Sequence, residues 1–247
     1  MIEIIPAILP KDYEDLKNKI AFVRGLVPIV QIDICDGIFV KTASWPFLSK
    51  AESGDIFKSN LDEHFSRILN EEEGMPFWED IDFELDLLVA DAIENFDIYT
   101  KLGPKKIIFH IEAVGNIESF KEFLEGIDMY TRDNIQIGVA INPATPLEQI
   151  FPLISCIDFV QCMGNDKIGY QGISLDEEVY KKIKIFREKY SDLPIAVDIG
   201  VNKKTASLLI KEGATKLVIG SAIFNTEDII ETIQEFKNLG LIHQNFL

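Results

Sequence analysis

Two aspartates each interrupt an otherwise apolar run of the sequence, Asp33 within VQIDIC and Asp198 within IAVDIG. Burial of a carboxylate is costly unless another group pairs with it or the fold uses it in chemistry. Two carboxylates that face one carbon can remove a proton beside a carbonyl and return one to the opposite face. Asp33 and Asp198 are therefore the candidate acid/base pair.

Glycine-containing loops follow the last three apolar runs of the chain. Gly169 and Gly172 lie in the first of these loops, Gly200 lies in the second, and Gly220 with Ser221 forms the third. Glycine lets backbone N–H groups approach a ligand closely, and the start of a helix favours a dianion. These loops predict a phosphate site, and together with the acid/base pair they predict a phosphorylated sugar as the ligand.

Eight apolar runs with the length of buried strands alternate with amphipathic segments. The runs cover 2–9, 28–34, 82–89, 106–111, 135–141, 157–163, 194–199 and 216–222, and the helix-like segments cover 12–25, 91–102, 116–127, 146–154, 175–190, 202–212 and 226–239. This alternation predicts an α/β fold, a single (β/α)8 TIM barrel with residues 1–247 as one domain. A doubly wound open sheet is the alternative, although no G-x-G-x-x-G follows the first run.

Reactive residues of such a barrel lie at the carboxyl ends of its strands. We therefore expect Asp33 and Asp198 to face one pocket at that end. The same rule adds further polar candidates, which are Asp36, Asp86, His110, Glu112 and Asn142.

The connection between the second and third strands is longer than the others and strongly acidic. Residues 50–82 contain ten acidic and three basic residues. We interpret residues 45–81 as an insertion within the barrel, and the stretch NLDEHFSRILNEEE predicts a solvated helix in it. A lid or an assembly surface is the alternative, since long barrel loops often carry function. Trp45 and Trp78 flank the insertion and are expected to anchor it.

The chain has 24 basic and 41 acidic residues, a net charge of −17 and a pI near 4.6. This balance argues against nucleic acid or an anionic membrane as a partner, because both attract a basic surface. The three cysteines, Cys35, Cys156 and Cys162, form no C-x-x-C pair and indicate a reduced, cytoplasmic protein. No apolar stretch is long enough to span a membrane. A homo-oligomer is compatible with the sequence.

The sequence resembles the ribulose-phosphate 3-epimerases from Pro6 to about Phe236. The matching stretches are PAIL (6–9), IDICDG (32–37), FHIEA (109–113), NPATPLE (142–148), VDIGVN (197–202) and GSAIF (220–224). The resemblance implies a (β/α)8 barrel that interconverts D-ribulose 5-phosphate and D-xylulose 5-phosphate through an enediolate. It also implies that Asp33 and Asp198 are the acid/base pair and that the three glycine loops hold the phosphate.

The same resemblance implies a divalent metal, Mg, Mn, Zn or Fe, held by the two aspartates and two histidines. In this chain Gln31 and Asp86 occupy the two histidine positions, and Ile199 replaces a glycine after Asp198. An all-oxygen set of Gln31, Asp33, Asp86 and Asp198 suits Mg²⁺ or Mn²⁺. The alternative is a site without metal, in which Asp86 adds negative charge and raises the pKa of a neighbouring aspartate.

Three functions follow from these residues. The first is an isomerase, a ketose-phosphate 3-epimerase that uses Asp33 and Asp198. The second is an enzyme of the same barrel with a changed substrate or reaction. The third is a non-catalytic phosphosugar-binding barrel that has lost the metal site.

Overall fold

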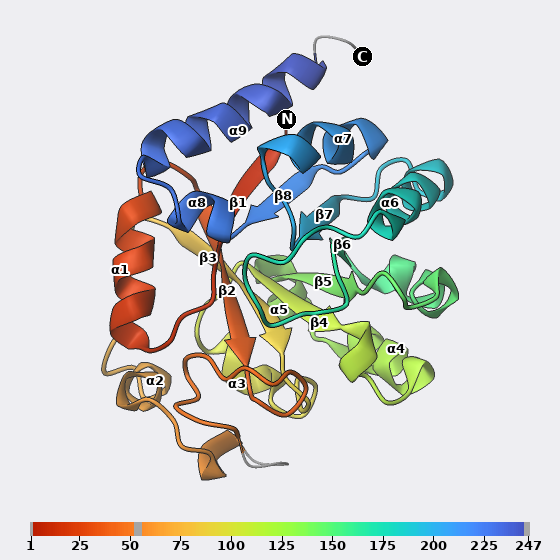
Figure 1. The fold of residues 1–247 in the computed structure, drawn as a ribbon. Helices are drawn as coiled ribbons and strands as arrows, with labels where there is room; N and C mark the ends of the chain where they lie inside the picture. Colours follow the sequence, from red (N-terminus) through yellow and green to blue (C-terminus); the bar gives the residue numbers. More distant parts are fainter. Residues whose placement is uncertain (1, 52–55, 245–247) are drawn as a thin grey trace.

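The computed structural model describes residues 2–51 and 56–244 and shows eight parallel strands closed into a barrel (Figure 1). Each strand pairs with the next in sequence order, and β1 pairs with β8. The strands are β1 Glu3–Ile8, β2 Ile29–Cys35, β3 Asp82–Leu88, β4 Lys106–His110, β5 Gln136–Ile141, β6 Phe159–Met163, β7 Ile195–Asp198 and β8 Lys216–Ile219. The predicted (β/α)8 barrel is confirmed, and the open sheet is wrong.

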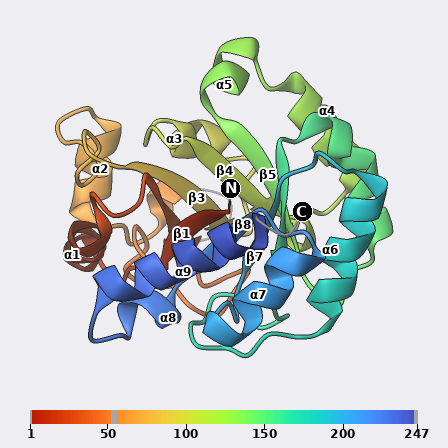
Figure 2. The same cartoon turned by 90° about the horizontal axis from the view of Figure 1, so that it is seen from above.

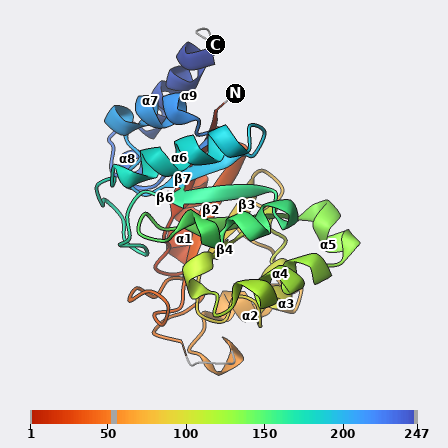
Figure 3. The same cartoon turned by 90° about the vertical axis from the view of Figure 1, so that its right-hand side faces the viewer.

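Helices surround the barrel, as the views from above and from the side show (Figures 2 and 3). They are α1 Tyr13–Val23, α2 Glu63–Leu69, α3 Phe96–Thr100, α4 Ile117–Gly126, α5 Met129–Asn134, α6 Glu178–Lys189, α7 Lys203–Glu212, α8 Ser221–Phe224 and α9 Ile229–Gln244. Shorter 3₁₀ turns are η1 Ile56–Lys58, η2 Ile111–Ala113, η3 Leu147–Gln149 and η4 Phe151–Cys156. In the described residues no helix is long and apolar enough to cross a membrane.

Some predicted helices are shorter or of another type. The segment 146–154 forms η3 and η4 instead of an α-helix, and it contains Pro146 and Pro152, which lack the N–H that an α-helix uses. The segment 91–102 contains only the five-residue α3. The sequence patterns also missed α5 and α8, which are too short to show helical periodicity.

Two apolar layers hold the fold together. Outward-facing strand residues such as Ile32 and Val160 pack against buried helix residues such as Leu16 of α1 and Phe186 of α6. Alternate strand positions fill the barrel interior with a second group, including Ile5, Ile108, Val218 and Phe159. Because side chains alternate along each strand, the interior also receives the polar residues at every second position.

The amino end of the barrel interior holds two acids and two lysines, which we call the amino-end quartet: Glu3, Glu84, Lys106 and Lys216. Nζ of Lys106 lies 2.9 Å from Oε2 of Glu84 and 3.4 Å from Oε2 of Glu3. Nζ of Lys216 lies 3.9 Å from Oε2 of Glu3 and 4.0 Å from the ring centre of Phe159. The quartet therefore pairs its own charges.

Residues 45–81, which we interpret from the sequence as an insertion, lie beside α1 and contain α2 and η1 (Figures 1 and 2). Residues 52–55 of this segment lie outside the described part of the chain. Trp45 is fully buried, and its ring lies 5.8 Å from that of Phe65 in α2. Its backbone N–H also donates to the carbonyl of Pro10. Trp45 anchors the insertion as expected, whereas Trp78 is 61% exposed, so the same expectation for Trp78 is wrong.

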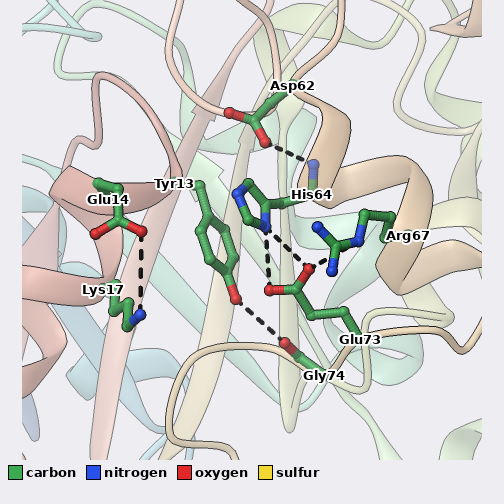
Figure 4. Close-up of polar contacts among 8 residues, drawn as sticks. All are labelled: Tyr13, Glu14, Lys17, Asp62, His64, Arg67, Glu73 and Gly74. Atoms are coloured by element: carbon green, nitrogen blue, oxygen red, sulfur yellow. Dashed lines mark hydrogen bonds and ion pairs between the residues drawn. The ribbon is translucent and has the colours of Figure 1, made fainter.

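A polar cluster ties the insertion to α1 (Figure 4). The ring of His64 stacks on that of Tyr13 with 3.9 Å between centroids, and Nδ1 of His64 lies 2.9 Å from Oε2 of Glu73. Nε of Arg67 lies 3.4 Å from the same oxygen, and the Tyr13 hydroxyl donates to the carbonyl of Gly74. The neighbouring Tyr13 hydroxyl, and then the His64 ring, lower the pKa of Glu73. These contacts fasten the start of α2, and the turn at Gly74 that follows it, to Tyr13 of α1.

Candidate active site

Three aspartates meet at the carboxyl end of the barrel interior, and we call them the aspartate cluster: Asp33, Asp86 and Asp198. They come from β2, β3 and β7, and Asp33 is the register partner of Asp86. One carboxylate oxygen from each lies within 4.8 Å of those of the other two. All three line a cavity of about 240 Å³. The expectation that Asp33 and Asp198 face one pocket is confirmed, and Asp86 joins them there.

Gln31 lies one interior position below Asp33 on β2 and is fully buried. Its amide Nε2 donates to Oδ1 of Asp33 at 2.9 Å and to Oδ2 of Asp198 at 3.4 Å. Its Oε1 is buried without a hydrogen-bond partner among the described residues. In this orientation Gln31 acts as a hydrogen-bond donor and positions the two carboxylates. The sequence predicts Gln31 as a metal ligand, and for that role the amide would have to rotate so that Oε1 faces the carboxylates.

His110 of β4 is the imidazole in contact with the cluster. Its Nε2 lies 2.9 Å from Oδ1 of Asp86, and both side chains are fully buried. Burial lowers the pKa of His110, but Asp86, with smaller contributions from Glu112 and Asp198, raises it overall. Oδ2 of Asp86 is buried and accepts no hydrogen bond from the described residues. The sequence placed His110 at a strand end but did not reveal this partner.

Burial and repulsion by neighbouring carboxylates make Asp33 and Asp198 weak acids. Burial, followed by the charges of Asp198 and Asp86, raises the pKa of Asp33 well above its usual range. Burial and Asp86 raise the pKa of Asp198 to about 7, against the backbone N–H of Ile199 and the amide of Gln31. Near neutral pH the pair can therefore hold one proton and release another, as acid/base chemistry requires.

The predicted phosphate loops form the other wall of the same cavity. Its lining includes Gly169 and Gly172 from the β6–α6 loop, Gly200 from the β7–α7 loop, and Gly220 with Ser221 after β8. No lysine or arginine lines the cavity in the described part of the chain. An anion here would be bound by backbone N–H groups and hydroxyls rather than by side-chain cations.

The start of α7 reaches this wall with its N–H groups organised by Asn202. The Asn202 side chain accepts from the N–H groups of Lys204 and Thr205, while the Thr205 hydroxyl accepts from the N–H of Asn202. Gly200 has a φ of 75°, and a Cβ on it would lie 2.5 Å from the N of Leu175. Only glycine fits this position, so the close approach of the two loops depends on it.

Ile199 lies between Asp198 and Gly200 of the glycine-rich wall and has an unfavourable backbone conformation. Its φ is 68°, a left-handed conformation that β-branched residues rarely adopt. Its N–H donates to Oδ1 of Asp198 at 2.7 Å. The strained backbone thus orients one carboxylate of the cluster.

The other strand-end candidates do not reach the cavity. Asp36 accepts three backbone N–H groups from the segments that follow β2 and β3, so it shapes those loops. Glu112 accepts from the N–H of Asn142 at 2.8 Å and from the hydroxyl of Thr145 at 2.6 Å. Glu112 and Asn142 therefore hold the β4 and β5 loops together, beside the site rather than in it.

The cluster has the chemistry of a divalent-cation site. Three carboxylates within a few ångströms place excess negative charge in a buried space, and one Asp86 oxygen there has no partner. Oxygen donors suit hard cations such as Mg²⁺ and Mn²⁺, whereas zinc sites usually include nitrogen or sulfur. The residues present therefore fit a divalent metal.

The fold and this cavity define a TIM barrel with an acidic centre beside a glycine-rich wall. The family model "Ribulose-phosphate 3 epimerase family" matches residues 68–224. The chain therefore belongs to the ribulose-phosphate 3-epimerase family. The aspartate cluster and all five predicted phosphate-loop residues lie in one cavity of a member of this family.

Individual relatives support this assignment. The chain is 28% identical to "Ribulose-phosphate 3-epimerase" from Bacillus subtilis (strain 168) over 96% of its length and 99% of that protein. It is 26% identical to "Ribulose-phosphate 3-epimerase, cytoplasmic isoform" from Oryza sativa subsp. japonica, over 95% and 92%. The crystal structure of 3-hexulose-6-phosphate synthase from Salmonella typhimurium superimposes with a TM-score of 0.66 at 14% identity, over 98% of this chain and 100% of that one, which shows the shared fold.

Proposed function

We propose that the protein epimerises a ketose phosphate at C3, interconverting D-ribulose 5-phosphate and D-xylulose 5-phosphate. The observation that carries this proposal is the shared cavity of Asp33, Asp198 and the glycine loops in a member of this family. The two carboxylates supply the proton transfers, and the loops supply an anchor for the phosphate at a fixed distance from them.

The raised pKa values are consistent with one aspartate acting as the base while the other acts as the acid. Burial and repulsion by neighbouring carboxylates raise the pKa of both Asp33 and Asp198 in the protein without metal, so near neutral pH the pair can share a proton. Asp198 removes the C3 proton from one face to give an enediolate, and Asp33 delivers a proton to the other face. In the reverse direction the roles exchange. Gln31 keeps both carboxylates in place through its amide N–H groups.

We propose that Asp33, Asp86 and Asp198 hold the divalent cation, Mg²⁺ or Mn²⁺ in preference to Zn²⁺ or Fe²⁺, because all three donate oxygen. When bound, such a cation would stabilise negative charge that develops on the substrate oxygens. The phosphate would lie against Gly169, Gly172, Gly200, Gly220 and Ser221.

The organisation of the chain is part of the same proposal. Residues 1–247 would form one domain, with residues 45–81 as an insertion. The free cysteines and the resemblance to a cytoplasmic isoform support a cytoplasmic location. The net charge of −17 argues against nucleic acid as the partner.

The decisive experiment follows the C3 proton of the substrate. Purified protein, loaded in turn with Mg²⁺, Mn²⁺, Zn²⁺ or Fe²⁺, is incubated with D-ribulose 5-phosphate in deuterated water and followed by proton NMR. We expect loss of the C3 proton signal together with appearance of the xylulose epimer. Absence of exchange with every metal would refute the proposal.

A phosphosugar-binding protein without catalysis, or with a changed substrate, is the second candidate. The observation in its favour is Asp86, which brings a third negative charge to a site that must stabilise an enediolate. This candidate predicts thermal stabilisation by ribulose 5-phosphate without proton exchange, or turnover of another member of a panel of ketose and aldose phosphates.

A further inference from the structure

The two carboxylate oxygens of Asp86 have different surroundings. Oδ1 lies 2.9 Å from Nε2 of His110, whereas Oδ2 is buried without a hydrogen-bond partner in the described residues. Asp86 also lines the active-site cavity and contributes an oxygen to the aspartate cluster. One oxygen is thus occupied by the protein, and the other is available to a ligand.

The position of His110 leaves its ring little freedom to move. Asp86 is the register partner of Ile108, so His110 lies two residues further along β4 on the same interior face. The His110 side chain is fully buried, and the ring of Phe39 lies 5.6 Å from it. The contact with Asp86 is therefore part of the packed interior, not an accident of two solvated side chains.

Asp86 needs such a partner because its neighbours repel it. Asp33 and Asp198 carry like charges close by, and Asp86 is among the causes that raise the pKa of each. A carboxylate in that position would turn away from the cluster unless a donor held it. Gln31 does this for Asp33 and Asp198, and His110 does it for Asp86.

We propose that His110 is a positioning residue that binds Oδ1 of Asp86 and directs Oδ2 toward Asp33 and Asp198, so that Asp86 serves as the third oxygen ligand of a divalent cation. This inference rests on the cation site put forward as part of the proposed function. It identifies His110 as the group that makes Asp86 an effective ligand. It also predicts that this all-oxygen site prefers zinc less strongly than a site with imidazole ligands would.

Metal binding without substrate tests the inference. Protein stripped of metal is titrated with Mn²⁺, and free Mn²⁺ is followed by electron paramagnetic resonance. We expect His110→Leu to weaken Mn²⁺ binding by about 10–100-fold, the usual effect of losing a group that orients a ligand. His110→Gln, whose amide nitrogen can take the place of Nε2, should stay within about threefold of the original protein.

Two further variants complete the test: His110→Asn is the substitute if His110→Leu does not fold, and Asp86→His tests the metal preference. Thermal unfolding in EDTA shows whether His110→Leu folds; if it does not, His110→Asn, whose donor lies nearer the backbone, takes its place with the same expected loss. Asp86→His should raise the ratio of zinc affinity to manganese affinity by at least about tenfold, because it supplies the nitrogen ligand that zinc favours.

The outcomes separate this inference from the proposed epimerase. Equal Mn²⁺ affinity in the Leu, Asn and Gln variants overturns the role of His110, even when the original protein exchanges C3 protons. Absence of Mn²⁺ binding in the original protein also overturns it, and proton exchange in EDTA would then leave the epimerase standing. An unchanged zinc-to-manganese ratio in Asp86→His removes Asp86 from the ligand set.

Discussion

The barrel interior contains charged residues at both ends, and the two groups differ in how their charges are balanced. The amino-end quartet, Glu3, Glu84, Lys106 and Lys216, sets two acids against two lysines at 2.9–3.9 Å. At the carboxyl end, the aspartate cluster sets three acids against the imidazole of His110, which lies 2.9 Å from Asp86. One end neutralises itself, and the other requires protons or a cation from outside.

This difference separates structural from functional charge within one fold. Buried ions paired by their neighbours hold a fold together or are at least tolerated, whereas uncompensated buried charge shifts pKa values and marks candidate sites. Glu84 and Glu3 outweigh burial at Lys106 and raise its pKa, so this lysine keeps its charge. Burial still raises the pKa of Glu84 and lowers that of Lys216 to about 8, so the pairing in the quartet is strongest at Lys106. Nothing comparable lowers the pKa of Asp33, which is raised instead. Variants at the carboxyl end should therefore reduce activity without loss of stability, whereas variants at the amino end should reduce stability.

The largest expected effect comes from removing an acid at the carboxyl end. Asp33→Asn and Asp198→Asn should each reduce epimerisation by about 10²–10⁴-fold, the usual contribution of an acid/base group. Each variant keeps one carboxylate, so it should still exchange the C3 proton of one epimer with solvent without inverting it. Proton NMR in deuterated water measures exchange and inversion together.

The two variants should differ in which epimer exchanges, since the carboxylates face opposite sides of C3. Thermal unfolding in EDTA serves as the control for folding, and neither variant should lose stability. Full epimerisation by either variant would show that the missing aspartate is not one of the two proton carriers.

The next largest effect is expected at the amino end, on stability rather than activity. Lys106→Met leaves the buried Glu84 without its 2.9 Å partner and should lower the free energy of unfolding by about 3–5 kcal/mol. Urea unfolding measures the loss. The double variant Glu84→Gln with Lys106→Met removes both charges and should recover most of it.

An exposed ion pair provides the matched control for this loss. Nζ of Lys184 lies 3.9 Å from Oε1 of Glu188, and both side chains are about two-thirds exposed. Lys184→Met should therefore cost less than about 0.5 kcal/mol, because water already screens the pair. If Lys106→Met and Lys184→Met cost the same, the quartet is not a buried, self-neutralised group.

The sequence predicted the aspartate pair and the phosphate loops because both leave local signals. A carboxylate within an apolar strand and a glycine at a strand-to-helix turn can each be recognised without knowing the partner. The barrel rule then placed Asp33, Asp198 and Gly200 at one end. Asp36 and Glu112 satisfied the same rule but bind loop backbone instead, since the rule fixes the end of a strand and not the direction of a side chain.

Contacts between distant strands could not be predicted in the same way. The bond between Asp86 and His110 joins β3 to β4 and depends on register, and the direction of the Gln31 amide depends on the two carboxylates beyond it. The amino-end quartet was missed altogether, because its lysines occur at strand starts, where a charged residue normally indicates solvent. The 3₁₀ turns at 147–156 were missed because their apolar spacing resembles that of a helix.

A smaller effect concerns the pH dependence of the protein without metal. The pKa of Asp198 rises from 3.8 to about 7 on folding, so between these values the folded state binds more protons than the unfolded chain. Stability is thus greatest at the acid side and falls as pH rises through about 7, by an amount on the order of a few kcal/mol. Urea unfolding in EDTA at pH 5 and pH 8 measures the fall.

Two controls assign this pH dependence to the carboxyl end. Asp198→Asn removes one of the two titrating aspartates and should reduce the dependence, while Asp33 maintains the rest. Asp86→Asn should also reduce it, because Asp86 is the largest repelling charge on Asp198. Mn²⁺ at pH 8 should restore stability to the original protein, since a ligand that binds only the folded state stabilises it. Equal stability at pH 5 and pH 8 would contradict the picture of an uncompensated cluster.

The smallest expected effect tests the backbone beside Asp198, where the two ends also differ. Ile199 has a φ of 68°, whereas no member of the amino-end quartet has a positive φ. Ile199→Gly and Ile199→Ala both lose the packing of the side chain, so their difference reports the backbone alone. Glycine should be more stable than alanine by about 1 kcal/mol at this position, because only alanine retains the left-handed penalty. Urea unfolding of the two variants measures that difference.

At Val218, in the regular strand β8, the difference in stability between the glycine and alanine variants should have the opposite sign. There Val218→Gly should be less stable than Val218→Ala by roughly 0.5–1 kcal/mol, because glycine loses more conformational freedom on folding and gains nothing in an extended backbone. A reversal of sign between the two positions would show that Ile199, whose N–H orients Asp198, has a strained backbone that Val218 lacks. The same sign at both would mean that Ile199 adopts its conformation without cost, and that the carboxyl end differs from the amino end in charge alone.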